Sequence, residues 1–160
     1  MREEKFLLDD IKLVVSDFDG VFTDGKLEIF SDGKTSKKID YKDIMGIALI
    51  LRKGINFAII SGEKSAAIDI IKEKFPNIEV FQGERKKINV LKSLIEKHKI
   101  TKENVVYIGD DVNDVECLDY VKFPATVPEA HKSILEKTNI YVTKSSCGNG
   151  AFREVTDLIQ

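Results

Sequence analysis

The sequence predicts an α/β fold in which a parallel, Rossmann-like sheet lies between two layers of helices. Short apolar runs alternate with segments of helical periodicity along the chain. The apolar runs are nearly continuous, as in strands that are covered on both faces. With 160 residues, of which 42% are hydrophobic and 32% charged, the chain fits one compact domain. We therefore expect a single three-layer domain over residues 1–160.

Each predicted strand ends in polar or turn residues, and helical segments lie between the strands. The strands are expected at residues 11–16, 57–60, 78–81 and 105–108. The helices are expected at residues 43–53, 64–75, 86–98, 113–120, 129–137 and 150–159. This alternation is typical of a parallel sheet with helical crossovers.

One segment interrupts the alternation directly after the first strand. Residues 26–30 and 35–41 flank the turn sequence Ser31-Asp32-Gly33-Lys34. An Asp-Gly pair between two short β-like runs is a strong signal for a hairpin. We expect a β-hairpin over about residues 26–41 that projects from the domain.

Composition excludes several classes of partner. The net charge of −2 gives no basic excess for nucleic acid. No apolar run approaches the roughly 18–20 residues that a membrane helix needs. Residues 1–10 do not resemble a secretory signal, and Cys117 and Cys147 lack the spacing of a metal or disulfide framework. We expect a cytoplasmic protein.

Two acidic groups follow predicted strands. Asp17 and Asp19 come after the first strand, and Asp110, Asp111 and Asp114 after the fourth. Alone, the first group could be a turn and the second a helix N-terminus. Because ligands bind at the carboxyl ends of parallel strands, we expect the groups to converge. Two carboxylates about 4 Å apart repel by roughly 4 kcal/mol at an effective dielectric near 20, so a cation, most suitably Mg²⁺, is predicted between them.

Two further strand ends offer complementary chemistry. Ser61 and Gly62 supply a hydroxyl and backbone N–H groups that could cradle a phosphate. Lys87 opens the next helical segment, from which it could reach inward. Each alone is an ordinary cap or surface residue. The order carboxylate, hydroxyl, amine, carboxylate is what makes both of them candidates.

In this order the residues resemble the motifs of the haloacid dehalogenase superfamily of phosphatases. The matching positions are the run from Asp17 to Asp24, then Ser61, Lys87, and residues 109–114. With Phe81-Gln82-Gly83 and residues 148–154, the chain is similar to the 3-deoxy-D-manno-octulosonate 8-phosphate phosphatase family. Close relatives of that family act on nine-carbon ulosonate 9-phosphates such as sialic acid precursors.

The resemblance implies a role for each motif. Asp17 would attack phosphorus, and Asp19 would act as general acid and then as general base. Asp17, the Asp19 carbonyl and Asp110 would hold Mg²⁺. The residues that would bind the substrate's phosphoryl group are Thr23, Ser61, Gly62 and Lys87.

The same resemblance bears on assembly. Residues 24–61 and 61–87 leave no room for the cap domain that many superfamily members carry over their sites. We therefore expect a neighbouring subunit to complete each active site, and the resemblance implies a homotetramer in which the hairpins pack together.

The substrate stays open between eight-carbon and nine-carbon sugar acid phosphates. Octulosonate phosphatases have arginine where this chain has Glu63, and Glu63 with Lys74 looks more like phosphatases for nine-carbon acids. Arg153 could contact a carboxylate or phosphate, or simply cover the surface.

Two other functions compete with the phosphatase. A receiver-like signalling domain would place its acceptor aspartate on a later strand. A catalytically silent oligomerisation module would be expected to lack Asp17, Asp19 or Lys87, yet all three are present.

Overall fold

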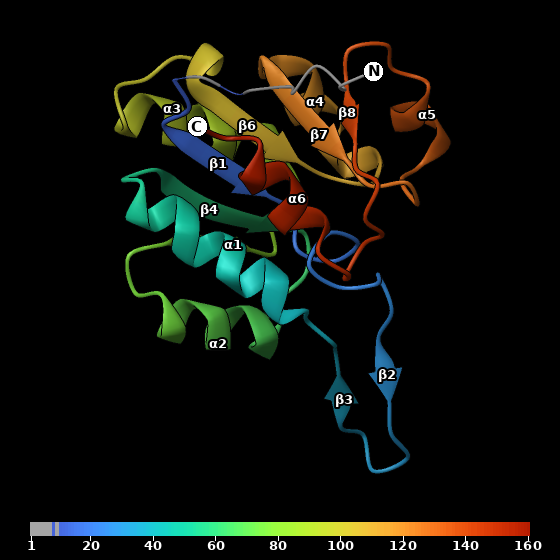
Figure 1. The fold of residues 1–160 in the computed structure, drawn as a ribbon. Coiled ribbons are helices and arrows are strands. Elements are labelled where there is room, and N and C mark those ends of the chain that lie inside the picture. Colours follow the sequence, from blue (N-terminus) through green and yellow to red (C-terminus); the bar gives the residue numbers. More distant parts are fainter. Residues whose placement is uncertain (1–7, 9) are drawn as a thin grey trace.

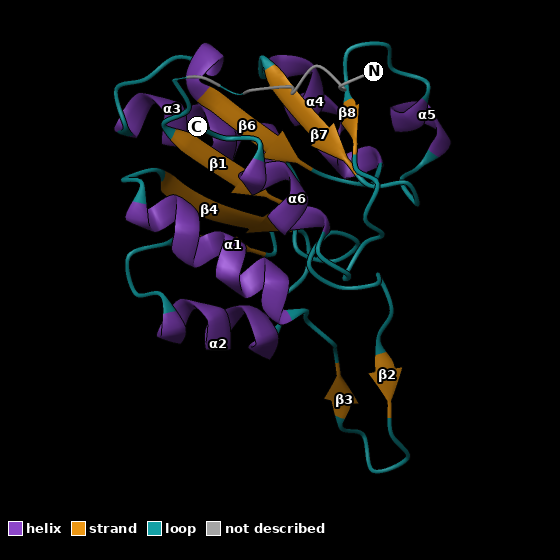
Figure 2. Cartoon of the chain, viewed as in Figure 1, coloured by secondary structure: helices purple, strands orange, loops and turns teal. Residues whose placement is uncertain are grey.

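The computed structural model describes Leu8 and residues 10–160, so most of the N-terminal segment considered above as a signal lies outside it. A six-stranded parallel sheet forms the centre (Figures 1 and 2). Its strands are β1 (Leu13–Ser16), β4 (Asn56–Ser61), β5 (Glu79–Gln82), β6 (Val105–Ile108), β7 (Phe123–Thr126) and β8 (Tyr141–Val142). The helices are α1 (Tyr41–Arg52), α2 (Ala66–Lys74), α3 (Lys87–Lys97), α4 (Val115–Tyr120), α5 (Lys132–Leu135) and α6 (Ala151–Asp157), with short 3₁₀ turns η1 (Lys102–Asn104) and η2 (Val112–Asp114).

The helices cover both faces of the sheet, as the continuous apolar strands predicted. Neighbouring strand residues point to opposite faces: Val14 packs in one core cluster, while Leu13 and Val15 pack in the other. The first cluster takes its helical residues from α1, α2 and α6, and the second from α3, α4 and α5 together with Ala151 at the start of α6. Figure 1 shows α1, α2 and α6 in front of the sheet and α3 behind it. The three-layer α/β prediction is confirmed.

The strand order is β5-β4-β1-β6-β7-β8. From β1 the chain first builds outward through β4 and β5, and then returns to the other side of β1 with β6. The order therefore reverses between β1 and β6, and such a switch point is where open α/β sheets bind ligands. Ser16, the last residue of β1, is in register with Ile108, the last residue of β6. The residues after these two strands thus start side by side.

Two strands and several boundaries differ from the expectation. β7 contains Pro124, which weakens a strand signal, and β8 has only two residues. α1 begins at Tyr41 because the Asp40 side chain accepts a hydrogen bond from the Lys42 amide and caps the helix. The helix expected at 129–137 is reduced to the four residues of α5.

The hairpin projects from the body of the fold, as predicted (Figure 1). It consists of β2 (Glu28–Ile29) paired antiparallel with β3 (Thr35–Ser36). Gly33 adopts φ +84° in the turn, a conformation that suits glycine. Among the described residues 24–61, only this hairpin, α1 and β4 form regular structure, so no cap domain covers the sheet there.

Candidate active site

The loop after β1 is anchored by apolar side chains that enter the core. Phe18 and Phe22 are fully buried, with ring centroids 5.8 Å apart, and Phe22 lies 4.5 Å from the Phe152 ring of α6. The Phe22 amide donates to the Phe18 carbonyl, so the chain turns directly after Asp17. This turn still leaves Asp17 and Asp19 on one cleft.

Asp17 lies at the switch point and is paired with a buried lysine. Its amide donates to the Ile108 carbonyl at the end of β6. Lys87, the first residue of α3, places its Nζ 2.9 Å from Asp17 Oδ1 and 2.8 Å from Asp114 Oδ1. The Lys87 side chain has no exposed surface. The inward reach predicted for Lys87 is therefore what the structure shows.

Asp114 has a supporting position, because its oxygens are already engaged. Tyr107 donates its hydroxyl to Asp114 Oδ1 at 2.7 Å, beside the bond from Lys87. The amides of Asp110 and Asp111 donate to Asp114 Oδ2. Asp114 thus fixes the backbone that carries Asp110, and Gly109 permits this because a Cβ there would lie 2.4 Å from the Asp114 Cγ.

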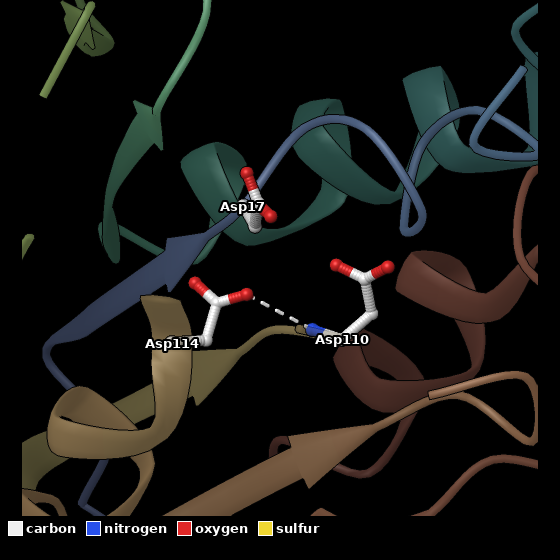
Figure 3. Close-up of side chains that lie close together, drawn as sticks. All are labelled: Asp17, Asp110 and Asp114. Atoms are coloured by element: carbon white, nitrogen blue, oxygen red, sulfur yellow. Dashed lines mark hydrogen bonds between the residues drawn. The ribbon is translucent and has the colours of Figure 1, made fainter. Parts of the chain in front are cut away.

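The carboxylates of Asp17, Asp110 and Asp114 gather closely enough to hold a metal ion (Figure 3). One oxygen from each lies within 4.8 Å of the others. Among the described residues, Asp110 Oδ1 is the buried side-chain polar atom that has no hydrogen-bond partner. A buried oxygen without a donor is expected where a cation belongs. Since Asp114 is engaged by four donors, Asp17 and Asp110 are the side chains that fit a hard divalent ion.

The charges at this site also favour a cation. Burial, and next the nearby Asp114, raises the pKa of Asp17 well above its usual range. Burial, with Asp114 again second, raises the pKa of Asp110 to about 6. Burial lowers the pKa of Lys87, but Asp17 and Asp114 outweigh it and the net shift is upward. Three carboxylates face one buried ammonium group, so a divalent ion would stabilise their ionised forms.

Gly20 brings the β1 loop against Asp110. Its φ of +82° is unfavourable for other residues, and a Cβ would lie 1.9 Å from Asp110 Oδ2. The glycine of the motif therefore allows the first acidic group to approach the second.

Asp19 is held at both of its oxygens. Thr23 donates its hydroxyl to Asp19 Oδ1 at 3.0 Å, and Lys37 places its Nζ 2.7 Å from Asp19 Oδ2. The Thr23 oxygen also accepts from the amides of Gly20 and Gly25. Since Thr23 is fully buried, its contacts indicate that it orients Asp19 and the loop. The sequence did not predict Lys37 as a site residue, because no motif surrounds it in the hairpin.

Ser61 and Gly62 line the same cleft as the aspartates. The Ser61 hydroxyl donates to the Glu63 carbonyl and accepts from the Glu63 amide, which holds the turn after β4. α2 begins at Ala66, two residues later than the start expected at Lys64. The cleft has a volume of about 230 Å³ and is lined by Asp17, Asp19, Gly20, Gly25, Ser61, Gly62, Glu63, Asp110, Asp111 and Asn113.

A larger groove continues from this cleft between the hairpin and the start of α2. Its volume is about 710 Å³, and it shares Asp19, Gly25 and Glu63 with the cleft. Lys37 and Lys64 also line it. This groove is where a group attached to a phosphate in the cleft would extend.

Two predicted substrate residues lie apart from the cleft within one chain. Lys74 is exposed at the C-terminal end of α2, whereas the cleft meets the residues before that helix. The Arg153 Nε donates to Asp157 Oδ1 on the same helix at 2.7 Å. Neither lines the cleft or the groove, whereas Glu63 lines both.

The C-terminal segment supports the site through backbone contacts. The Gly148 amide donates to the Val21 carbonyl in the β1 loop. Asp43, buried in the first turn of α1, accepts from the amides of Gly150 and Arg153 and so caps α6, whose own cap residue is Gly150. The segment between β8 and α6 is thereby held against the loop that carries the aspartates.

Fold and site together define a hydrolase of the haloacid dehalogenase type, in which a buried aspartate stands beside a divalent-cation site. The sequence pattern of the family described as haloacid dehalogenase-like hydrolase matches residues 56–155. The 3-deoxy-D-manno-octulosonate 8-phosphate phosphatases KdsC of Salmonella typhi and Escherichia coli K12 are each 33% identical over 151 residues, which is 94% of this chain and 80% of theirs.

Solved structures agree with these relatives. The 3-deoxy-D-manno-octulosonate 8-phosphate phosphatase of Moraxella catarrhalis, in complex with magnesium, phosphate and KDO, superposes with a TM-score of 0.86 at 32% identity, over 93% of this chain and 85% of that one. The Yersinia pestis enzyme gives a TM-score of 0.88 at 31% identity, over 93% and 80%. The chain therefore belongs to the 3-deoxy-D-manno-octulosonate 8-phosphate phosphatase family of the haloacid dehalogenase-like hydrolases, as its motifs predicted.

Proposed function

We propose that this chain is a Mg²⁺-dependent phosphomonoesterase that hydrolyses the phosphate ester of a 3-deoxy-2-ulosonic acid through a phosphoaspartate on Asp17. The observation that carries the proposal is the buried group of Asp17, Lys87 and Asp110 at the sheet's switch point. We take residues 1–160 as one phosphatase domain. A receiver-like domain is disfavoured because its acceptor aspartate would follow a later strand than β1.

Catalysis would proceed in two displacements. Asp17 attacks phosphorus, the bond from phosphorus to the sugar oxygen breaks, and Asp19 gives its proton to that oxygen. Asp19 then accepts a proton from a water molecule that attacks the phosphoaspartate. This second displacement releases inorganic phosphate and restores Asp17. Both steps depend on positioning and charge neutralisation more than on covalent assistance.

The cation site and Lys87 would supply the positive charge. Asp17, Asp110 and the Asp19 carbonyl would hold Mg²⁺, which offsets negative charge on the phosphoryl oxygens when it is bound. Lys87 would neutralise the nucleophile from the protein side, while Ser61 and Gly62, which line the cleft, would bind phosphoryl oxygens. Thr23, predicted as a phosphate contact, is better assigned to orienting Asp19, which its hydroxyl contacts.

Two observations point to different substrates. The named relatives are phosphatases for an eight-carbon acid. Glu63, which lines both the cleft and the groove, stands where octulosonate phosphatases carry arginine, and this favours a longer, more hydroxylated nine-carbon acid. We propose the eight-carbon ester as substrate and the nine-carbon ester as the alternative.

A homotetramer, with each site completed by a neighbouring copy, remains part of the proposal. The hairpin exposes Leu27, Ile29 and Phe30, with 51%, 69% and 47% of their surface accessible. Exposed apolar side chains on one projection are typical of an interface. A neighbouring copy would also bring Lys74 or Arg153 near a cleft that they do not reach within one chain.

The oligomer can be tested at the hairpin. Ile29→Asp should lower the sedimentation coefficient of the purified protein, whereas Asp32→Asn at the hairpin turn should leave it unchanged. An Ile29→Asp variant that sediments like the wild type would contradict the hairpin interface.

An assay of phosphate release tests both the activity and the choice of substrate. Within the described residues, no helix is both long and apolar enough to cross a membrane. We place the enzyme in the cytoplasm, and the assay uses the purified protein. The panel compares eight-carbon and nine-carbon ulosonate phosphates with glucose 6-phosphate, each with Mg²⁺ and with a chelator. We expect metal-dependent release with the highest kcat/KM on an ulosonate phosphate and none from Asp17→Asn, with Asp32→Asn as the matched active control. Release by Asp17→Asn at the wild-type rate would overturn the nucleophile assignment.

A further inference from the structure

We propose that Lys37, supplied by the hairpin, is a positioning residue for the acid–base carboxylate Asp19. This inference rests on the proposed function, because it assumes that Asp19 transfers a proton to and from the reacting groups. It adds a residue outside the family motifs, in an element that the sequence marked only for assembly.

The contact is short and largely shielded. Lys37 Nζ lies 2.7 Å from Asp19 Oδ2, and only 13% of the Lys37 side chain is exposed. The same ammonium group lies 5.8 Å from the centroid of the buried Phe18 ring. Lys37 therefore contacts two consecutive residues of the nucleophile loop, although it is separated from Asp19 by 18 positions in the sequence.

Other lysines of the hairpin behave differently. Lys34 at the turn is 82% exposed and lies 3.5 Å from Asp32, as surface lysines commonly do. Lys38, the next residue after Lys37, is exposed and does not line the groove; it borders a hollow with Asp24 and Glu28 that Lys37 also borders. Of these three lysines, only Lys37 pairs with Asp19 and lines the groove.

Together Lys37 and Thr23 fix both Asp19 oxygens. A carboxylate with a donor at each oxygen has its plane defined, which is what proton transfer in a fixed direction requires. Asp19 and Lys37 both line the 710 Å³ groove, so the pair borders the space for the leaving group. The placement of the hairpin would thus set the geometry of acid–base catalysis.

The test separates positioning from substrate binding by using three esters. We compare kcat/KM for an ulosonate phosphate, for glucose 6-phosphate and for p-nitrophenyl phosphate, whose leaving group needs no proton. Lys37→Met should lower kcat/KM about 10- to 100-fold on the two sugar esters, less than the roughly 100- to 10,000-fold that general acid–base catalysis contributes as a whole, and about 3-fold or less on the aryl ester. Lys37→Arg should restore most of the loss, and Lys38→Met should match the wild type.

Each other result has a definite meaning. A loss confined to the ulosonate ester would make Lys37 a ligand of the substrate carboxylate and overturn the positioning role. An equal loss on all three esters would indicate a purely structural role, as would a Lys37→Arg variant as impaired as Lys37→Met. If the wild type releases no phosphate from any ester, the proposed function fails; if it is active and Lys37→Met equals it, only this inference fails. Circular dichroism of each variant establishes that the fold is kept.

Discussion

The two aspartates of the β1 loop each pair with a lysine, but the two pairs are built in different ways. Lys87 is the first residue of α3, which covers one face of the sheet, and is fully buried between Asp17 and Asp114. Lys37 comes from the projecting hairpin and pairs with Asp19, whose side chain is 31% exposed. The nucleophile is thus held by the core, whereas the acid–base residue depends on an element with few core contacts. Removing Lys87 and removing Lys37 should therefore differ in their effects on stability and on activity.

The largest effect is expected for Lys87→Met. This change leaves the buried carboxylates of Asp17 and Asp114 facing each other without their cation, so the free energy of unfolding should fall by about 3 kcal/mol. Activity should drop by about 100-fold or more, because the charge beside the nucleophile is lost. Urea unfolding and phosphate release measure the two losses. Lys86→Met, at the exposed neighbouring position, should change neither.

Asp110→Ala should come next, because it removes the partnerless buried oxygen at the cation site. Mg²⁺ should raise the thermal unfolding temperature of the wild type, since an ion that binds only the folded state stabilises it. The variant should show no such rise, and phosphate release should require far more Mg²⁺ or cease. A variant that Mg²⁺ stabilises as much as the wild type would remove Asp110 from the cation site. Asp32→Ala at the hairpin turn serves as the control.

A third prediction concerns Asp43, which joins α1 to α6 through its bonds from the Gly150 and Arg153 amides. Burial raises its pKa from 3.8 to about 6, against the opposing effect of the amides it accepts from. The fold therefore favours the protonated form, and the stability that this group contributes is full below about pH 4 and is lost as the pH rises through about 6.

Asp43→Asn should remove this pH dependence. At pH 4 the variant should be less stable than the wild type by about 1 kcal/mol, because Asn offers one oxygen for two amides. Between pH 4 and pH 7 the difference in free energy of unfolding between the variant and the wild type should narrow or reverse, with a total change of up to about 2 kcal/mol. Urea unfolding at pH 4, 5, 6 and 7 measures it. A constant difference across this range would show that Asp43 titrates alike in both states.

The smallest effect on stability is expected for Lys37→Met. A partly exposed ion pair contributes about 1 kcal/mol or less, so the free energy of unfolding should change little while sugar ester hydrolysis suffers. Urea unfolding of Lys37→Met and Lys87→Met side by side measures the contrast. Equal destabilisation by both changes would contradict the expected difference between the buried Lys87 pair and the hairpin Lys37 pair.

The site residues at the ends of β1 and β6 could be predicted from the sequence because their signals are local. Four apolar runs marked strands, and the residues directly after the first and fourth runs are those that the switch point brings together. β7 and β8 were missed because a proline and a two-residue length hide them from any pattern of periodicity. Lys74 and Arg153 were selected by position in a motif, and one chain by itself does not bring either to the cleft.

The sequence by itself determined the fold class, the hairpin and the aspartates at the ends of β1 and β6, because strand periodicity and strand ends are properties of neighbouring residues. Only the tertiary structure decided which carboxylates remain open to a cation and which lysine serves which aspartate. Asp114 is engaged by Lys87 over 27 positions, Asp19 by Lys37 over 18, and Asp43 caps α6 over 107. Which residues pair over such separations depends on packing in three dimensions, and no local sequence pattern predicts it.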